Sequence, residues 1–545
     1  MTTQLTKDDP LERFRKYDTI SPFELKDELT RIAKDPSSTE VFLNAGRGNP
    51  NWIATTPREA YYLFGSFGIA ESKRVWDEPD LGGMPERDGI GKRYDAFIRK
   101  RANEPGAACL KACIDYGVER LGFDKDAWLY ELTDAMVGDM YPVPMRMGTH
   151  MEKAVRAFLV REMCGDDPPA GTYDIFAVEG GTAAMCYIFD SLMVNGLLKK
   201  GDKIALAMPT FTPYIEIAHL EKYSFEIVEV QADTLYESGA RSWQYPDAEI
   251  DKILDPGVKA FFVVNPSNPP SYAMAKASLK RISDIVGGKR KDLIIITDDV
   301  YGTFVDGFES LMKWAPHNTL TVYSFSKYFG CTGWRLGVIA LNEDNVIDKA
   351  IATLPEPEKN RLRKRYGPLT LTPDNIKFID RLVADSRQIA LNHTAGLSMP
   401  QQVMMTFFAL FDLTDPQHRY RALTKKICRQ RLEKLWSGLN IPLPPDPLRA
   451  GYYSTLDLMQ WAEVTYGKDF MKYLVANYHP LQIVFALATY HSIVLLNGSG
   501  FGAPDWSVRC SLANLPDSAY EEIGADLMSV AQTAVDRWKA QKVKA

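Results

Sequence analysis

One lysine stands in a setting in which its amine could act as a covalent catalyst. Lys327 follows the short apolar run 319–323, has the hydroxyls of Ser324 and Ser326 close by in sequence, and is followed eight residues later by Arg335. A lysine after a strand, flanked by hydroxyls and close to an arginine, fits a Schiff-base amine beside a phosphate-binding site. A single lysine is usually a solvated surface residue, so this interpretation depends on agreement with other motifs.

A glycine-rich turn could bind the phosphate. Residues 179–182 read Glu-Gly-Gly-Thr and separate the apolar run 175–178 from an expected helix over 183–195. At such a helix N-terminus, the backbone N–H groups near Gly181 and the hydroxyl of Thr182 would converge on an anion. Most turns of this kind bind nothing, so this motif is also weak when taken alone.

Three further strand ends carry groups that could hold a flat ring. Phe211 follows the run 204–208 and could stack on an aromatic ligand, although a core phenylalanine is the simpler explanation. Asn268 lies in a turn fixed by prolines, where it is either a binding residue or a turn former. Asp298 and Tyr301 follow the run 293–296. Because successive strand side chains alternate, only one of Asp298 and Asp299 should point toward a ligand.

The motifs follow short apolar runs that are typical of buried strands in an α/β fold. Several runs are far enough apart for an intervening helix, for example over 181–200 and 275–290. This spacing indicates a mostly parallel, seven-stranded sheet with helices on both faces. Ligands of such folds bind beyond the strand ends. The expected strands are 175–178, 204–208, 225–230, 259–264, 293–296, 319–323 and 337–341.

The later part of the chain predicts a second, smaller α+β unit. Apolar spacing favours helices over 402–411 and 421–439, and 440–450 is a proline-rich turn region. The basic run 359–365 is expected to be a solvated helix face. The charged and aromatic segment 70–130 predicts no particular role.

Composition restricts the classes of partner. The 545 residues carry a formal net charge of -6, which offers no basic surface for nucleic acid. Seven scattered cysteines without a C-x-x-C pair favour the reduced thiols of a cytoplasmic protein and give no metal site. The sequence shows neither the layout of a signal peptide nor an apolar run of the roughly 18 residues that span a membrane. The expected partner is therefore a small molecule, with no nucleic acid and no membrane.

Taken together in chain order, the motifs resemble those of the fold-type I pyridoxal-phosphate enzymes, specifically the aspartate aminotransferase superfamily, over residues 44–515. The resemblance implies pyridoxal 5'-phosphate as the cofactor, bound covalently by Lys327 and paired through its pyridine nitrogen with Asp298. It implies that Tyr301 and Asn268 bond the ring hydroxyl and that Phe211 stacks on the ring. The residues that the resemblance assigns to the phosphate are Gly181, Thr182, Ser324 and Arg335.

The same resemblance implies the substrate contacts and the assembly. Arg509, in the segment 506–512, corresponds to the arginine that binds the substrate α-carboxylate, and Asn268 is a further expected substrate contact. Gly46 and Arg47 belong to a glycine-rich segment that covers the substrate. Tyr141 resembles the tyrosine that reaches the phosphate of the partner subunit, which implies a homodimer or a larger assembly of dimers.

The resemblance also implies how the chain is divided. We expect a large cofactor-binding domain over 60–395, with insertions near 60–130 and 345–390. A small domain would combine 1–59 with 396–545.

The extra length indicates which reaction to expect. The insertions, together with segments 46–52, 141–144 and 392–398, resemble the aspartate 4-decarboxylase family. The best-known aspartate aminotransferases pin the substrate β-carboxylate with an arginine where this chain has Thr394. Such a salt bridge would oppose loss of CO2, because the carboxylate charge disappears as the bond breaks. A second departure is Pro270-Ser271, where the superfamily has threonine and glycine.

The expected reaction is β-decarboxylation of L-aspartate to L-alanine and CO2, with minor aspartate aminotransferase activity. The main alternative is a plain class I aminotransferase acting on aspartate or a related amino acid. A pyridoxal-phosphate transcription regulator is a third hypothesis. It would need a winged helix and a basic face before the enzyme-like part, and residues 1–40 favour neither.

Overall fold

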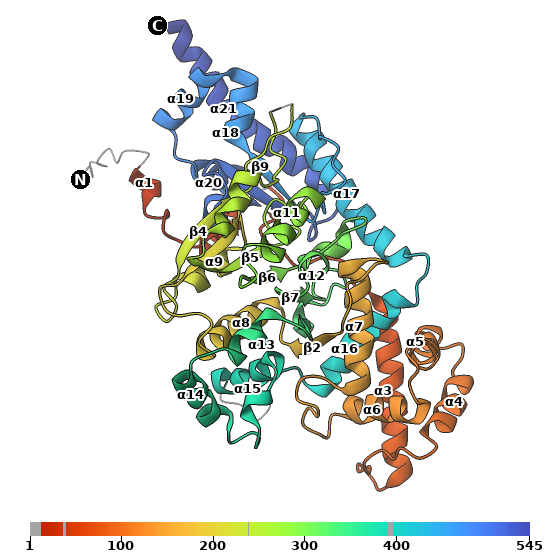
Figure 1. Cartoon of the computed structure of the whole chain (residues 1–545). Coiled ribbons are helices and arrows are strands. Elements are labelled where there is room, and N and C mark those ends of the chain that lie inside the picture. Colours follow the sequence, from red (N-terminus) through yellow and green to blue (C-terminus); the bar gives the residue numbers. More distant parts are fainter. Residues whose placement is uncertain (1–11, 36–39, 238, 391–395, 545) are drawn as a thin grey trace, which may run out of the picture.

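The computed structural model describes residues 12–35, 40–237, 239–390 and 396–544. Within these ranges, no helix combines the length and the apolar character needed to cross a membrane. Figure 1 shows a central sheet with helices on both sides. The helical layer that holds α3 to α6 and the C-terminal helix α21 lie at opposite ends of the molecule.

A seven-stranded sheet forms the centre, with strand order β2-β8-β7-β6-β5-β3-β4. Strand β8 is antiparallel to both of its neighbours, and the other adjacent pairs are parallel. Each strand coincides with an expected apolar run, which confirms the predicted fold class. The strands are β2 (Tyr173–Val178), β3 (Lys203–Met208), β4 (Glu226–Gln231), β5 (Val258–Val264), β6 (Ile294–Asp298), β7 (Thr319–Ser324) and β8 (Gly337–Asn342).

Alternating strand residues face two different helical layers, which explains why the inner strands are mostly apolar. Phe262 and Ile296 belong to a cluster with α8 (Gly181–Val194), α9 (Thr212–His219) and α15 (Phe378–Ala390). Phe261 and Ile295, one residue earlier on the same strands, pack with α11 (Lys276–Gly287) and α12 (Leu311–Trp314). The first layer continues into α13 (Val346–Ala352) and α14 (Glu356–Tyr366).

The long charged segment near residues 60–130 folds as a helical layer beside the sheet. Its helices pack against α7 (Thr149–Cys164) and α16 (Met399–Leu413) around one apolar cluster. Cys113 is buried in this cluster and Cys109 packs against it. The layer consists of α3 (Thr55–Val75), α4 (Ile90–Lys100), α5 (Ala107–Glu119) and α6 (Lys125–Val137).

A smaller α+β unit combines segments near the N-terminus with segments from the C-terminal part of the chain. Its three-stranded sheet has the order β11-β12-β9, formed by Leu496–Asn497, Ser507–Ser511 and Tyr453–Asp457. A second pair joins β1 (Leu43–Asn44) to β10 (Ile493–Val494). The main helices are α2 (Pro22–Ala33), α17 (Arg419–Leu439), α18 (Leu458–Tyr466), α19 (Lys468–Asn477), α20 (Gln482–His491) and α21 (Ala519–Lys544).

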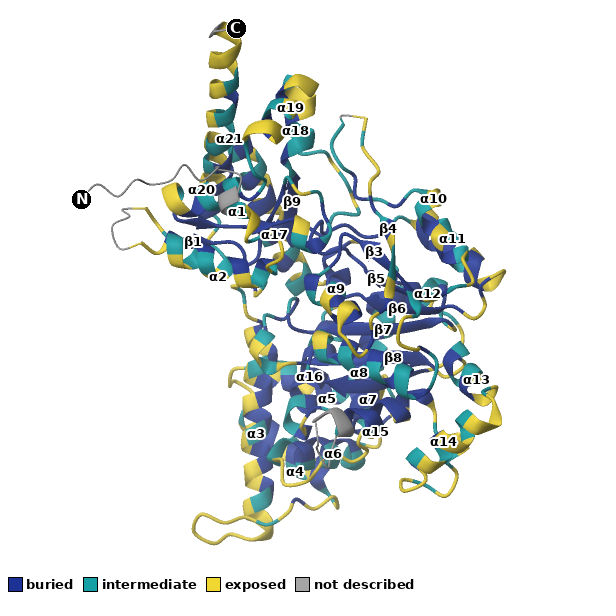
Figure 2. Cartoon of the chain, turned by 90° about the vertical axis from the view of Figure 1, so that its left-hand side faces the viewer, coloured by how far each residue is buried: buried dark blue, intermediate teal, exposed yellow. Residues whose placement is uncertain are grey.

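One apolar cluster holds the smaller unit together. Leu25 and Leu29 of α2 pack there with Leu435 of α17 and Leu527 of α21. Helix α16 instead contributes to the core around α3 and α7. The domain boundaries near residues 60 and 396 stay a prediction. Figure 2 shows most strands of the large sheet buried and much of α14 and the end of α21 exposed.

Candidate active site

The strand ends of the large sheet bring the expected residues to one edge. Val178 of β2 and Ser324 of β7 both pair with Gly337 of β8. Because β8 runs opposite to its neighbours, its first residue lies at their carboxyl ends, and Arg335 precedes it there. On the next strand, Asp298 pairs with Val322 of β7. The glycine turn, the lysine loop, the arginine and the aspartate therefore surround a single edge of the sheet.

A candidate anion-binding cradle forms at the start of α8. Arg335 adopts a left-handed backbone conformation with φ of 55°, and its Nη2 donates to the carbonyl of Glu179 at 3.2 Å. Gly180 has φ of +94°, which favours glycine, and a Cβ there would lie only 2.6 Å from that Nη2. The buried Ser324 hydroxyl donates to Ser326 Oγ at 3.0 Å. A guanidinium, paired hydroxyls and a helix N-terminus together favour a phosphate.

Only one of the two neighbouring aspartates points toward the lysine. Asp298 Oδ2 accepts a hydrogen bond from the Tyr214 hydroxyl at 2.5 Å, and Asp298 Oδ1 accepts one from the Val300 N–H at 3.2 Å. Burial raises the pKa of Asp298 to about 6, although these hydrogen bonds and the nearby Lys327 amine oppose the increase. Asp299 turns to the opposite side, where Thr297 and Ser310 donate to it. Burial raises the pKa of Asp299 to about 7.

The Lys327 amine lies beneath the glycine-rich segment near the N-terminus. Its Nζ donates to the carbonyl of Gly48 at 3.2 Å. A Cβ on Gly48 would lie 2.6 Å from the Tyr453 hydroxyl, so a side chain there would collide with the site. Gly330 has φ of +58°, and a Cβ on it would lie 1.9 Å from the carbonyl oxygen of Trp52. The loop after Lys327 and the segment around Trp52 are therefore tightly packed against each other.

Arg509 is a buried cation without an acidic partner among the described residues. Its side chain is 1% exposed, its Nη1 donates to Asn268 Oδ1 at 3.3 Å, and its Nη2 donates to the carbonyl of Gly46 at 2.9 Å. Its Nε is buried and has no hydrogen-bond partner. The guanidinium lies over the ring of Tyr453 at 4.5 Å, and burial lowers the pKa of Arg509. An uncompensated buried charge is costly, so this arrangement fits an anionic ligand.

Two tyrosines connect the lysine side of the site to the arginine side. The hydroxyls of Tyr301 and Tyr453 are 3.0 Å apart, and both side chains are buried. Tyr452, the residue before Tyr453, donates to the carbonyl of Gly48 at 2.8 Å. Gly48 therefore accepts from both Lys327 and Tyr452, while its neighbour Gly46 accepts from Arg509.

Four expected site residues have looser surroundings. Thr182 lies in the first turn of α8 and is exposed, and Phe211 is partly buried with its ring edge-on to Tyr214 at 5.3 Å. Arg47 and Tyr141 are exposed, and within the described ranges neither forms a hydrogen bond or ion pair. Thr394 lies outside the described residues.

Three residues of the site were missed in the sequence. Tyr214 lies one helical turn after Phe211, and that spacing could have indicated it. Tyr453 gives no signal because its role depends on contacts with segments far away in sequence. Ser271 was noticed only as a departure, and the structure gives it a role. It is fully buried with φ of 69°, and its Oγ accepts the N–H groups of Tyr452 at 3.1 Å and Tyr453 at 3.3 Å.

A mostly parallel sheet with a lysine, an acidic residue and an anion cradle at its carboxyl edge defines the fold-type I class of pyridoxal-phosphate enzymes. The chain belongs to the class I and II aminotransferase family, whose sequence model matches residues 177–526. Enzymes of this family depend on pyridoxal 5'-phosphate, and this is the cofactor of the chain. The buried carboxylate, the amine and the cationic cradle fit its ring nitrogen, aldehyde and phosphate.

Comparison with known proteins places the chain more closely within the family. It is 48% identical to the bifunctional aspartate aminotransferase and L-aspartate beta-decarboxylase of Pseudomonas sp, over 97% of this chain and 98% of the relative. Among solved structures, it is similar to the aspartate aminotransferase from Thermus thermophilus with maleate, at a TM-score of 0.53 and 17% identity over 97% of this chain and 98% of that one. The chain is also similar to the aromatic aminotransferase from Pyrococcus horikoshii, with a TM-score of 0.54 and 17% identity over 93% of this chain and 99% of that one. These structural likenesses show the fold alone.

Proposed function

We propose that this chain removes the β-carboxylate of L-aspartate to give L-alanine and CO2, with aspartate transamination as a minor second activity. One observation supports this most directly. Lys327 donates to the carbonyl of Gly48 and Arg509 to the carbonyl of Gly46. An amine and a guanidinium therefore both bond to carbonyls of one short segment, which supports a role for this pair in binding an amino acid. The name of the Pseudomonas relative supports the choice of aspartate and of decarboxylation.

The cofactor would be held by the strand-end residues. Asp298 would keep the ring nitrogen protonated, Tyr301 and Asn268 would bond the ring oxygen, and Phe211 would pack on the ring face. Gly181, Thr182, Ser324 and Arg335 would bind the phosphate. Bound in this way, pyridoxal 5'-phosphate supplies an electron sink for charge that develops next to the substrate amine.

The remaining residues would act on the substrate. Arg509 would grip the α-carboxylate through two parallel hydrogen bonds, which fixes the orientation of the Cα–H bond. Lys327 would take the proton from Cα and return it during the reaction. Arg47, with Gly46, lies on the covering segment and is the candidate for contact with the β-carboxylate, because the rest of the described site offers no second cation there.

The products require one proton to be added at Cβ when CO2 leaves with the carboxylate carbon. Pyridoxal 5'-phosphate, when bound, would supply the sink for the electron pair of the broken bond until Cβ is protonated. A strong ion pair to the β-carboxylate would stabilise the reactant relative to the transition state. An exposed, adaptable Arg47 satisfies this requirement better than a buried guanidinium such as Arg509.

The assembly is also part of the proposal. Tyr141 is 73% exposed in the single chain, so it is free to contact a second subunit, and a homodimer or a larger assembly of dimers would place it near the partner's phosphate site. All seven cysteines are unpaired, which supports a reducing, cytoplasmic location.

The test is to supply the purified holoenzyme with L-aspartate and no keto acid and to quantify alanine, CO2 and oxaloacetate. We expect alanine and CO2 in equal amounts over many turnovers, with oxaloacetate as a small fraction. The family also contains plain aminotransferases. Oxaloacetate equal to the bound cofactor, with no CO2, would favour that second function and overturn the first.

A further inference from the structure

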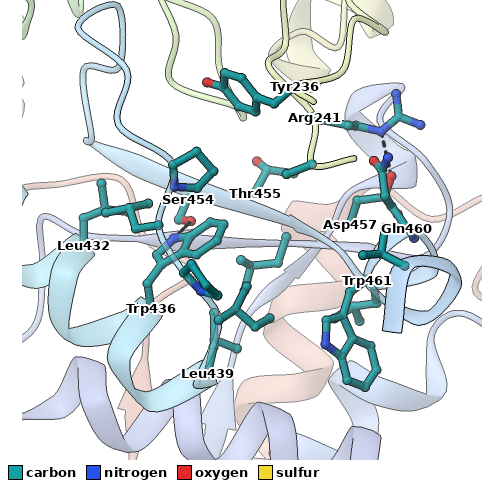
Figure 3. A pocket seen from close by; sticks show the side chains of 18 of the residues that line it. Tyr236, Arg241, Leu432, Trp436, Leu439, Ser454, Thr455, Asp457, Gln460 and Trp461 are labelled. Carbon is teal, nitrogen blue, oxygen red and sulfur yellow. Dashed lines mark hydrogen bonds and ion pairs between the residues drawn. The ribbon is translucent and has the colours of Figure 1, made fainter. Parts of the chain in front are cut away.

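A second cavity lies along β9, the edge strand of the smaller sheet. Its volume is about 1000 Å³, at the upper end of the range for small-molecule sites. Figure 3 shows Tyr236 on one side of β9 and Trp436 and Leu439 on the other, with Trp461 at one end. As far as the described residues go, the wall of this cavity includes neither Lys327 nor Arg509.

The charges of the side chains in the wall do not sum to zero. Arg241 donates through Nε to Asp457 Oδ2 at 2.6 Å, so these two neutralise each other. Arg449 is the third charged residue of the wall, and among the described residues it has no ion pair with an acid. Its Nε donates to the Tyr272 hydroxyl at 2.8 Å, and its guanidinium lies 5.0 Å from the centre of that ring. The residues of the wall therefore carry one more positive than negative charge, and the carboxylate of Asp446, which accepts from the Tyr236 hydroxyl, lies outside the wall.

Polar atoms without partners also lie in this wall. Arg449 Nη2, Thr455 Oγ1 and Gln460 Oε1 are buried and have no hydrogen-bond partner among the described residues. Thr455 is 7% exposed, and Figure 3 shows its side chain on the same side of β9 as Tyr236. Buried polar atoms are rarely left unpaired in folded proteins, and small side-chain movements would bring these three atoms within reach of a ligand or water in the cavity.

We propose that this cavity binds a small monocarboxylate with an aromatic or branched apolar body. The apolar part would pack among the tryptophans and leucines, and the carboxylate would pair with Arg449 through its free Nη2. A cation would meet Arg449 unfavourably, and a fully apolar ligand would leave all three polar atoms unpaired.

The site would be distinct from the substrate site but would share a residue with it. Tyr453 lines the cavity, and its ring also supports Arg509 at 4.5 Å. Thr455 is the register partner of Arg509 in the smaller sheet. The ligand would therefore lie next to the substrate arginine without touching it.

Calorimetric titration of the holoenzyme with 1-naphthoate tests the proposal. The titration is done with and without saturating succinate, a dicarboxylate that competes at the substrate site. We expect one naphthoate per chain with an affinity that succinate does not change. Naphthoate displaced by succinate, or no naphthoate binding at all, would overturn the proposal.

The neutral 1-naphthamide tests the role of the charge without any mutation. It should bind about ten-fold more weakly than 1-naphthoate, since it cannot form the charge-assisted pair. Arg449→Met should abolish this preference, while Arg99→Met, at an exposed arginine on α4, should retain it. Equal affinities of acid and amide for the wild-type protein, or an unchanged preference in Arg449→Met, would contradict the assignment of Arg449.

Discussion

The proposed active site has two halves, one for the cofactor and one for the substrate, that are built in different ways. The cofactor half consists of strand ends of one sheet, where Asp298 and Ser324 end the neighbouring strands β6 and β7 and Lys327 follows β7. The substrate half consists of distant segments, since Arg509 bonds to partners 241 and 463 residues away. Sheet topology fixes the first half, whereas the second depends on how the smaller unit packs against the sheet. Changes in the first half should remove the chemistry, and changes in the second should mainly weaken substrate binding and orientation.

Lys327→Ala should have the largest effect. It removes the group that moves the substrate proton, so we expect alanine formation to fall by about 10⁴-fold or more. The variant should also lose the absorbance that borohydride bleaches in the wild type. Substrate binding, measured by calorimetry with succinate, should remain because Arg509 is untouched. Turnover close to the wild-type rate would end the proposed mechanism.

Asp298→Asn, with its neighbour Asp299→Asn as the matched control, tests how specific the cofactor half is. The amide cannot hold a proton on the ring nitrogen, and loss of one partner of a buried ion pair costs roughly 3–5 kcal/mol, so kcat should fall by about 10³-fold. Asp299 faces Ser310 and Thr297 instead, and we expect its variant to keep kcat within about ten-fold. Equal losses in both variants would show that the two sides of the strand are not functionally different.

The same aspartate should limit stability when the cofactor is absent. Burial raises the pKa of Asp298 from its ordinary value of 3.8 to about 6. A raised carboxyl pKa means that the folded state binds the proton more tightly, so its contribution to stability is lost as the pH rises from about 4 to 6. Cofactor-free Asp298→Asn should therefore unfold at a higher urea concentration than the cofactor-free wild type at pH 7.5. An unchanged midpoint would contradict this account of the buried charge.

Arg509→Lys should affect the substrate half alone. Lysine keeps the charge but cannot make the two parallel hydrogen bonds, so kcat/KM should fall by about 10²-fold, mostly through KM. Cofactor absorbance and cofactor affinity should match the wild type. If the cofactor were lost together with activity, the two halves would not be separable.

Tyr214→Phe should produce a smaller, pH-dependent effect in the cofactor half. The Tyr214 hydroxyl donates to Asp298 and lowers its pKa, against the effect of burial. Without this donor the pKa of Asp298 should rise, so cofactor affinity should begin to weaken at a higher pH on acidification than in the wild type. Titrations of the apoenzyme with pyridoxal 5'-phosphate between pH 5.5 and 8 would measure this. A midpoint that stays in place or moves to lower pH would exclude the role of Tyr214.

The fold could be predicted where a short stretch of sequence by itself indicates its secondary structure. Buried parallel strands are continuous apolar runs bounded by turns, and the expected run 204–208 became β3 (Lys203–Met208). The strands of the smaller sheet have two to five residues and pair across long distances, so their sequence carries little signal. The helices of the layer around α3 to α6 were also missed, since their charged and aromatic composition masked the apolar faces.

The residues of the candidate site also differ in whether the sequence could predict them. Lys327, Asp298 and Arg335 could be identified because each follows or precedes a recognisable strand. The contacts of Tyr453 with Tyr301 and Arg509 could not be predicted, since they exist only after distant segments pack together. Arg509 itself was found through resemblance to a family motif and not from its spacing to any other residue.

Variants of Ser271 test how the substrate half is connected to the cofactor half, and they should have the smallest effect on activity. Its hydroxyl accepts the N–H groups of Tyr452 and Tyr453, while its left-handed backbone conformation costs a non-glycine residue roughly 1–2 kcal/mol. Ser271→Ala keeps that strain and leaves two buried donors unpaired, so it should lose about 1–3 kcal/mol of stability and raise KM several-fold.

Ser271→Gly separates strain from hydrogen bonding at the same position. It removes the hydroxyl but also relieves the backbone, so its unfolding midpoint should lie above that of Ser271→Ala, with a similar KM. Both variants should retain the cofactor absorbance, because the hydroxyl positions Tyr453 and not Lys327. A wild-type KM in both would mean that Ser271 serves only folding. A raised KM with intact cofactor binding would show that this serine aligns the substrate half with the strand ends of the sheet.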